Sequence, residues 1–134
     1  MLNIAHRGAS GRFPENTVPA FHAAIEAGAD MCELDVQLSC DAALVVIHDG
    51  TVDRTTDGSG AVSAMTLADL RRLDAGIRFG EQFSGERIPT LDEVFAAVNG
   101  RCGLNIELKA AGIEQRVCDT IRANGGLTNV LVSS

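Results

Sequence analysis

Short apolar runs alternate with helical patterns along most of this sequence, and this alternation restricts its fold more than any other feature. Strand-like runs occur at residues 2–6, 31–38, 43–48, 101–108 and 129–132. Helical segments separate several of these runs, which is the order that a parallel sheet covered by helices requires. In such sheets the functional residues gather at the carboxyl ends of the strands. We therefore examine the polar residues at those ends first.

Four segments have the apolar spacing of amphipathic helices: residues 17–27, 66–73, 91–98 and 113–123. Asn16 and Thr17 are both plausible N-caps of the first helix, Gly28 follows it as a C-cap, and Thr90 precedes the third. About five strands and four helices are too few to close an eight-stranded barrel. Residues 50–89, rich in Gly, Thr, Ser and Asp, interrupt the alternation and are called the inserted segment below.

Composition narrows the range of functions. The chain has 134 residues, which fits one domain, and 46% of them are hydrophobic, enough to form a core. A net charge of −7 and the lack of Trp and Tyr argue against a nucleic acid or an anionic membrane surface as partner. No apolar stretch approaches the ~20 residues of a membrane span. The four cysteines form no CxxC pair, so we expect a reduced, cytoplasmic setting.

Three acidic residues in strand-like runs are candidate metal ligands. Glu33 and Asp35 stand two apart, so both carboxylates project from the same face of their strand. A solvated strand face is the alternative explanation for this pair. Glu107 lies between Ile106 and Leu108, whose apolar character predicts burial, and it makes that alternative less favoured. Clustered carboxylate oxygens on rigid strands suit Mg²⁺ or Ca²⁺.

Two histidines end apolar runs, and a basic residue follows the first of them. His6 and His48 would face the same end of a parallel sheet, where two imidazoles can divide the work of general base and general acid. For each histidine alone, a core residue satisfied by one hydrogen bond is the alternative. Arg7, followed by Gly8, can present a guanidinium and backbone N–H groups to a phosphate.

Seven short motifs occur in the order found in one known family. They are His6-Arg7-Gly8, Pro14-Glu15-Asn16-Thr17, Glu33-Leu34-Asp35-Val36, His48-Asp49, Arg54-Thr55-Thr56, Pro89-Thr90-Leu91 and Asn105-Ile106-Glu107-Leu108-Lys109. Together they make the sequence resemble the glycerophosphodiester phosphodiesterase family. The resemblance runs from residue 2 to residue 134, and no single motif carries it.

This resemblance implies a fold and a reaction. The fold is an α/β, TIM-type (β/α)₈ barrel, truncated to its N-terminal part, with residues 1–134 forming one incomplete domain. The inserted segment would lie over the barrel mouth and recognise the glycerol end of the substrate. The reaction is hydrolysis of a glycerophosphodiester, a small molecule, to glycerol 3-phosphate and an alcohol. His6 and His48 would be the acid–base pair.

The resemblance also implies which residues bind the substrate and a cation. The expected ligands of a divalent cation, Mg²⁺ or Ca²⁺, are Glu33, Asp35 and Glu107. The residues expected to contact the phosphate or shape the entrance are Arg7, Lys109 and Asn16. Two alternatives share this sequence pattern: a catalytically silent half-barrel that keeps the metal and phosphate site, and a related phosphodiesterase acting on a lipid.

The sequence departs from the family pattern in two places. Ser39-Cys40-Asp41-Ala42 replaces the usual Thr-x-Asp-Gly turn, which removes a glycine but no catalytic group. The chain also stops after its fifth predicted strand, whereas an eight-stranded barrel needs roughly 250 residues. Residues 130–132 would then form an exposed apolar edge that favours association. If the chain folds as given, we expect a homodimer or a higher homo-oligomer.

Overall fold

The computed structural model describes residues 1–126 and 129–134. Its elements are β1 (Ile4–His6), α1 (Val18–Glu26), β2 (Met31–Leu38), β3 (Leu44–Val46), α2 (Leu67–Arg71), α3 (Leu91–Val98), β4 (Gly103–Leu108), α4 (Glu114–Ala123) and β5 (Val130–Ser133), with 3₁₀ turns at Val62–Ala64 and Glu81–Phe83. Every predicted strand and helix is present, and β2 and α3 have the predicted bounds. The two 3₁₀ turns lie in the inserted segment, where no periodicity predicted them.

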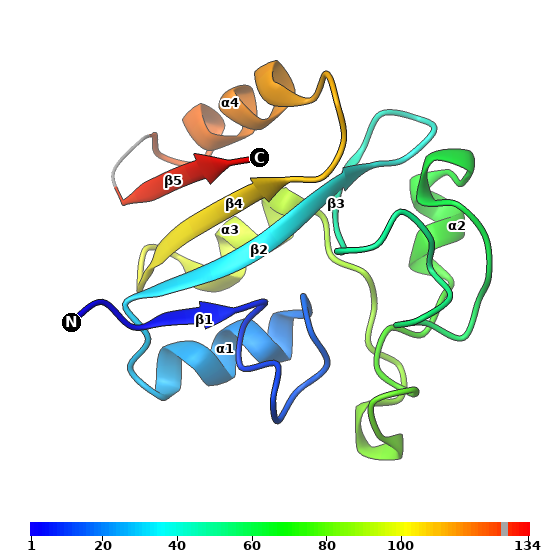
Figure 1. Cartoon of the computed structure of the whole chain (residues 1–134), viewed down its shortest axis with the longest axis horizontal. Helices are drawn as coiled ribbons and strands as arrows, with labels where there is room; N and C mark the ends of the chain where they lie inside the picture. The colour runs from blue at the N-terminus through cyan, green and yellow to red at the C-terminus, as the bar shows by residue number, and fades with distance from the viewer. Residues whose placement is uncertain (127–128) are drawn as a thin grey trace.

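Four strands form a parallel sheet in the order β1-β2-β4-β5, with β2 at its centre (Figure 1). The register sets the candidate site. His6 is opposite Glu33 across the first pair of strands, and Asp35 is opposite Glu107 across the second. Since side chains alternate along a strand, Glu33, Asp35 and Glu107 all project from one face of the sheet.

The prediction that β3 runs parallel to the other strands is wrong. Its residues pair antiparallel with the last three residues of β2. The Asp35 carbonyl accepts from Ile47, and the next carbonyl along β2, that of Val36, accepts from Lys109 in the opposite direction. β3 therefore continues the edge that β1 occupies up to His6. His48 reaches this end of the sheet because the chain turns back in a hairpin.

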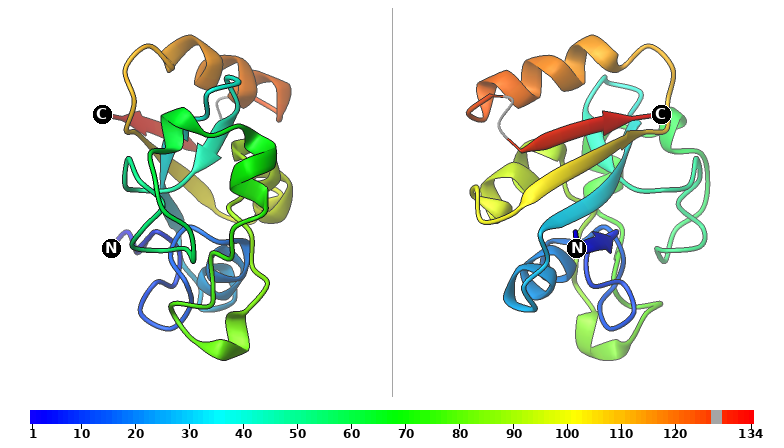
Figure 2. Two further views of the ribbon diagram at one scale, coloured as in Figure 1. Left: turned by 90° about the vertical axis from the view of Figure 1, so that its right-hand side faces the viewer. Right: turned by 60° about the vertical axis from the view of Figure 1, so that its left-hand side comes forward.

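Helices α1, α3 and α4 lie along one face of the sheet, as the left view of Figure 2 shows. The core fills the space between these helices and the strands. Its largest fully buried members include Phe21 of α1, Leu34 of β2, Leu91 of α3, Ile106 of β4 and Ile121 of α4. None of the helices in the described residues is long and apolar enough to span a membrane.

Local sequence signals explain where the helices begin. Thr90 caps α3, and its hydroxyl accepts a hydrogen bond from the Glu93 N–H at 3.2 Å. Thr66 and Asp69 form a reciprocal capping box at the start of α2. Gly8 permits the close approach of the loop after β1 to α1: a Cβ at this position would lie 2.7 Å from the Ala20 carbonyl carbon.

The inserted segment, residues 50–89, packs around a hydrophobic cluster of its own. Val52, Val62, Leu70 and Ile88 are buried there together with Val45 and Ile47 from the β3 hairpin. In Figure 1 this segment lies beside the end of the sheet that carries the hairpin. At the opposite side of the sheet β5 exposes Leu131 and Val132, the apolar edge that the sequence predicts.

Candidate functional site

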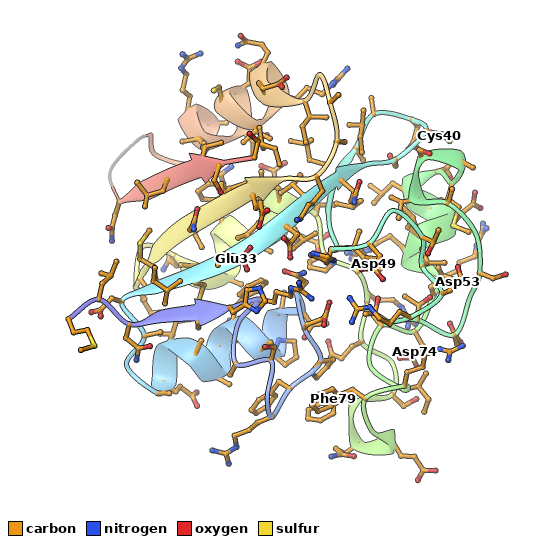
Figure 3. The ribbon with its side chains drawn as sticks, in the orientation of Figure 1. Glu33, Cys40, Asp49, Asp53, Asp74 and Phe79 are labelled. Carbon is orange, nitrogen blue, oxygen red and sulfur yellow. The ribbon has the colours of Figure 1, made fainter. Side chains whose placement is uncertain are left out.

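Three carboxylates from the two central strands form a cluster. One oxygen of each of Glu33, Asp35 and Glu107 lies within 4.8 Å of the other two. Glu33 is 7% exposed and Asp35 is fully buried, so these side chains do not decorate a solvated strand face. Figure 3 shows Glu33 over the middle of the sheet. Both residues stand in the middle of β2 and not at its end, because β2 extends past the parallel sheet to pair with β3.

Two oxygens of this cluster have no hydrogen-bond donor among the residues that the structure describes. They are Glu33 Oε1 and Asp35 Oδ1, and both are buried. A carboxylate oxygen can only accept, and burying it without a donor or a cation is costly. Three clustered carboxylates, two of them with an unpaired buried oxygen, suit a hard divalent cation, so the residues present fit the metal that the sequence predicts.

Crowding of negative charge is visible in the protonation of the cluster. Burial, first of all, and then the nearby Asp35 and Glu107 together raise the pKa of Glu33 to about 7, although the hydrogen bond from the Arg7 N–H opposes them. Lys109 has the opposite effect on Glu107. Its Nζ donates to Glu107 Oε1 at 2.9 Å and lowers the pKa of that carboxyl. Glu33 is therefore the member of the cluster that holds a proton near neutral pH when no cation is present.

The loop after β1 brings Arg7 against two members of the cluster. Its backbone N–H donates to Glu33 Oε2 at 3.1 Å, and its Nε lies 3.4 Å from Asp35 Oδ2. Arg7 has a positive φ of 59°, an uncommon conformation outside glycine that directs both groups inward. Lys109 directly follows β4, and its Nζ lies 4.0 Å from Asp35 Oδ1. Both predicted phosphate-binding cations thus border the carboxylates.

Asn16 lies behind the cluster and not at an exposed entrance. It is 3% exposed, and its Nδ2 donates to Asp35 Oδ2 at 3.0 Å. Its φ of 58° is a conformation that Asn tolerates better than most residues. Thr17, the alternative N-cap candidate, occupies the N-cap position of α1. The structure therefore gives Asn16 a place as a partner of Asp35.

Both predicted histidines border the cluster, and neither is a core residue. His6 ends β1 with its side chain 68% exposed, and Nε2 lies 3.8 Å from Glu33 Oε2. His48 stands two residues beyond β3, with its side chain 31% exposed. Its Nδ1 is 2.7 Å from Asp49 Oδ1, and its carbonyl accepts from Gln37 Nε2. The His48 ring also contributes to the lowered pKa of Glu107.

Three further charged residues surround the site, and sequence reasoning assigned them no role. They are Glu15, Asp49 and Arg54, which form a chain of ion pairs reaching Arg7 at one end and His48 at the other. Figure 3 labels Asp49 where the inserted segment meets the sheet. Their only sequence signal is that each stands in a motif shared with the family; side-chain pairing over 39 positions, from Glu15 to Arg54, has no periodic pattern.

A pocket of about 140 Å³ opens next to these residues. It lies between the loop before α1 and the inserted segment, and Glu15, Arg54, Arg78 and Phe79 are among its lining residues. Phe79 packs edge-on against Phe83, with the ring centroids 5.5 Å apart. The inserted segment thus supplies one wall of a space adjoining the site.

A parallel sheet with helices along one face and polar residues toward the carboxyl end of its parallel-paired residues is the arrangement of α/β barrels. The sequence profile of the glycerophosphoryl diester phosphodiesterase family matches residues 6–126, and the chain belongs to this family. A glycerophosphodiester phosphodiesterase of Caldanaerobacter subterraneus subsp. tengcongensis is 52% identical over 99% of this chain and 57% of its own length. One of Bacillus subtilis is 39% identical over 91% of this chain and 46% of its own length.

Solved structures agree with the sequence comparison. A glycerophosphodiester phosphodiesterase from Agrobacterium tumefaciens matches 98% of this chain and 57% of its own, with a TM-score of 0.93 and 41% identity. An Oleispira antarctica phosphodiesterase, solved with the product sn-glycerol-3-phosphate, matches 98% and 56%, with a TM-score of 0.90 and 37% identity. The predicted fold class, the N-terminal part of a TIM-type barrel, is confirmed. The chain spans about half the length of these relatives.

Proposed function

We propose that this protein hydrolyses glycerophosphodiesters to glycerol 3-phosphate and an alcohol with the help of a divalent cation. The observation that carries the proposal is the pair of buried carboxylate oxygens, Glu33 Oε1 and Asp35 Oδ1, that have no donor among the described residues. Folding keeps such oxygens unpaired at a cost, which a cation would remove. The family supports the reaction class, and its members' names give the substrate class.

The cation is proposed to bind Glu33, Asp35 and Glu107, with Mg²⁺ and Ca²⁺ as the two candidates. When bound, it would offset the negative charge of a phosphodiester and of the transition state. Arg7 and Lys109, both next to the carboxylates, would contact the phosphate oxygens. A guanidinium with two N–H groups on one edge suits such oxygens, while the ammonium acts as a point charge.

The two histidines are proposed to move the protons. One imidazole would remove the proton of the attacking hydroxyl, which in one family mechanism is the neighbouring glycerol hydroxyl, and the other would protonate the leaving alkoxide. Attack of that hydroxyl on phosphorus, with loss of the alcohol, would give a cyclic phosphate, and water would then open this ring to glycerol phosphate. In neutral His48, the hydrogen bond to Asp49 favours the proton on Nδ1, which leaves Nε2 as an acceptor. The inserted segment is proposed to border the substrate through the pocket at Arg54 and Phe79.

The test is the release of glycerol 3-phosphate from glycerophosphoethanolamine with Mg²⁺ or Ca²⁺ added. We expect metal-dependent release that His6→Ala and His48→Ala each reduce by about 10²- to 10⁴-fold, the usual contribution of a general acid or base. His22→Ala is the matched control, because His22 is exposed on α1 outside the site. A chelator should abolish release by the wild-type protein.

Two results would overturn the proposal. Release that persists in both site variants would show that other groups carry the protons. Cation binding seen by calorimetry without any release would instead identify a catalytically silent half-barrel that keeps the metal and phosphate site. A parallel assay with a lysophospholipid distinguishes the lipid phosphodiesterase.

Sedimentation velocity of the same sample tests the expected homo-oligomer, for which a monomeric peak is the contrary outcome.

A further inference from the structure

Arg54 of the inserted segment is bound by two carboxylates from different parts of the chain. Its Nε and Nη2 donate to the two oxygens of Asp49 at 2.9 and 3.1 Å. Its Nη1 and Nη2 donate to the two oxygens of Glu15 at 3.1 and 2.8 Å. All three guanidinium nitrogens are used, in two forked pairs, which is a geometry that fixes direction as well as distance.

Each of these carboxylates also accepts a hydrogen bond from a residue of the candidate site, and it does so through the oxygen that Arg54 Nη2 contacts. Asp49 Oδ1 accepts from His48 Nδ1 at 2.7 Å, and Glu15 Oε1 accepts from Arg7 Nη1 at 3.1 Å. Arg54 is therefore one residue removed from the imidazole on one side and from the guanidinium on the other. No other described residue bonds to both Asp49 and Glu15.

The ion pairs that Arg54 makes keep the carboxyl groups of Glu15 and Asp49 ionised. Burial raises the pKa of Glu15, but Arg54 and Arg7 outweigh that effect and lower it. Arg54 and, after it, His48 lower the pKa of Asp49. Both carboxyls therefore remain ionised and act only as acceptors. An ionised Asp49 at Nδ1 decides which nitrogen of a neutral His48 carries the proton.

Folding stability alone does not account for this arrangement. The Arg54 side chain is 49% exposed, and exposed ion pairs contribute little to stability. The side chains that Arg54 orders, by contrast, are much less exposed: 19% for Glu15 and 29% for Asp49. A forked guanidinium between them limits their rotation, so its effect falls on the orientation of His48 and Arg7.

We propose that Arg54 is a positioning residue that orients His48 through Asp49 and Arg7 through Glu15, and so couples the inserted segment to the site. The proposed benefit to catalysis rests on the function proposed above, whereas the orientation of the two side chains does not. Lysine should replace this residue only in part, because an ammonium keeps the charge but makes no forked pair with two carboxylates at once.

The test compares Arg54→Gln and Arg54→Lys with Arg72→Gln. Arg72, at the end of α2, is the matched control, because its exposed guanidinium pairs with Asp69 and with no other carboxylate among the described residues. Ring-nitrogen NMR of the three histidines reads the tautomer of His48 above its titration range. We expect wild type and Arg72→Gln to show the Nδ1–H form, Arg54→Gln to lose this preference, and Arg54→Lys to fall between them. Thermal unfolding should be nearly unchanged in all three variants.

The orientation proposal and the proposed function fail in different ways. If His48 has the same ring-nitrogen signals in wild type and in both Arg54 variants, Arg54 does not position it, whatever the activity. If the signals change as expected and wild type releases glycerol 3-phosphate, kcat should fall about 10- to 100-fold in Arg54→Gln, the usual effect of removing an outer partner of a reacting group. An unchanged kcat would overturn the coupling.

If wild type releases nothing, the proposed function fails and the NMR result still decides the orientation. Should Arg54→Gln unfold, Arg54→Lys decides alone.

Discussion

The substitution Glu33→Gln should stabilise the cation-free protein and at the same time abolish its binding of a cation. Glu33 is 7% exposed, and its pKa is raised to about 7 from an ordinary value of 4.5 by burial and by the charges of Asp35 and Glu107. Glutamine has nearly the same shape. It keeps an acceptor for the Arg7 N–H and places an amide donor near Glu107, where a protonated Glu33 would have its hydroxyl.

The size of the effect follows from the two pKa values. Between about pH 4.5 and pH 7 the folded protein binds more protons than the unfolded chain, so its stability falls as the pH rises. The stabilising contribution is complete below pH 4.5 and is lost as the pH passes through 7. With each pKa unit worth about 1.4 kcal/mol, the loss is about 3 kcal/mol at pH 8 and about 1 kcal/mol at pH 5. Glu33→Gln carries no charge and escapes this loss.

Urea unfolding in the presence of a chelator, at pH 5 and at pH 8, measures the effect. We expect Glu33→Gln to exceed wild type by about 3 kcal/mol at pH 8 and by about 1 kcal/mol at pH 5. Glu26→Gln, on the exposed surface of α1, should show neither difference. Added Mg²⁺ or Ca²⁺ should stabilise wild type and Glu26→Gln, but not Glu33→Gln, by about 2.7 kcal/mol at a hundredfold excess over the dissociation constant. A variant that is less stable than wild type at both pH values would refute the reasoning.

Three other substitutions test the packing around the site. Asn16→Ala removes the amide that holds Asp35 and should weaken cation binding about 10- to 100-fold by calorimetry; an unchanged affinity would contradict this. Gly8→Ala combines a φ of +79° with a Cβ 2.7 Å from Ala20, so urea unfolding should show a loss of about 2 kcal/mol or more. Thr90→Ala should cost about 1 kcal/mol in the same assay, and no loss would mean that the cap of α3 is replaced by water.

The carboxylate cluster could be predicted because a strand repeats every two residues. Glu33 and Asp35 share a face by spacing alone, and an apolar setting around Glu107 predicts a buried strand. Once the strands are taken to be parallel neighbours, the three side chains must converge, and the structure confirms the convergence. The bounds of β2 and α3 could be predicted for a similar reason, since strict alternation and a Thr cap are local signals.

The direction of β3 could not be predicted in this way. An apolar run of three to six residues has the same pattern whether its strand pairs parallel or antiparallel. The turn before it also lacks the glycine that usually marks a tight hairpin. Ala42 instead takes a φ of 65°, and Ser39 closes the turn by accepting from the Ala43 N–H through its hydroxyl. The sequence thus predicts the correct end of the sheet for His48, although the strand that precedes it runs in the opposite direction to the predicted one.

The Arg54 network lay outside sequence reasoning for a different physical reason. Strand and helix periodicity describe side chains that meet a backbone neighbour at a fixed offset, whereas Glu15 and Arg54 meet across loops that follow no repeat. Their pairing depends on where the inserted segment docks, and its own hydrophobic cluster with Val45 and Ile47 decides that. Val45 and Ile47 of this cluster belong to the hairpin that leads to His48, so the same packing holds the inserted segment against that hairpin. An apolar cluster that looks purely structural in the sequence thus determines where Arg54 meets Asp49 and Glu15.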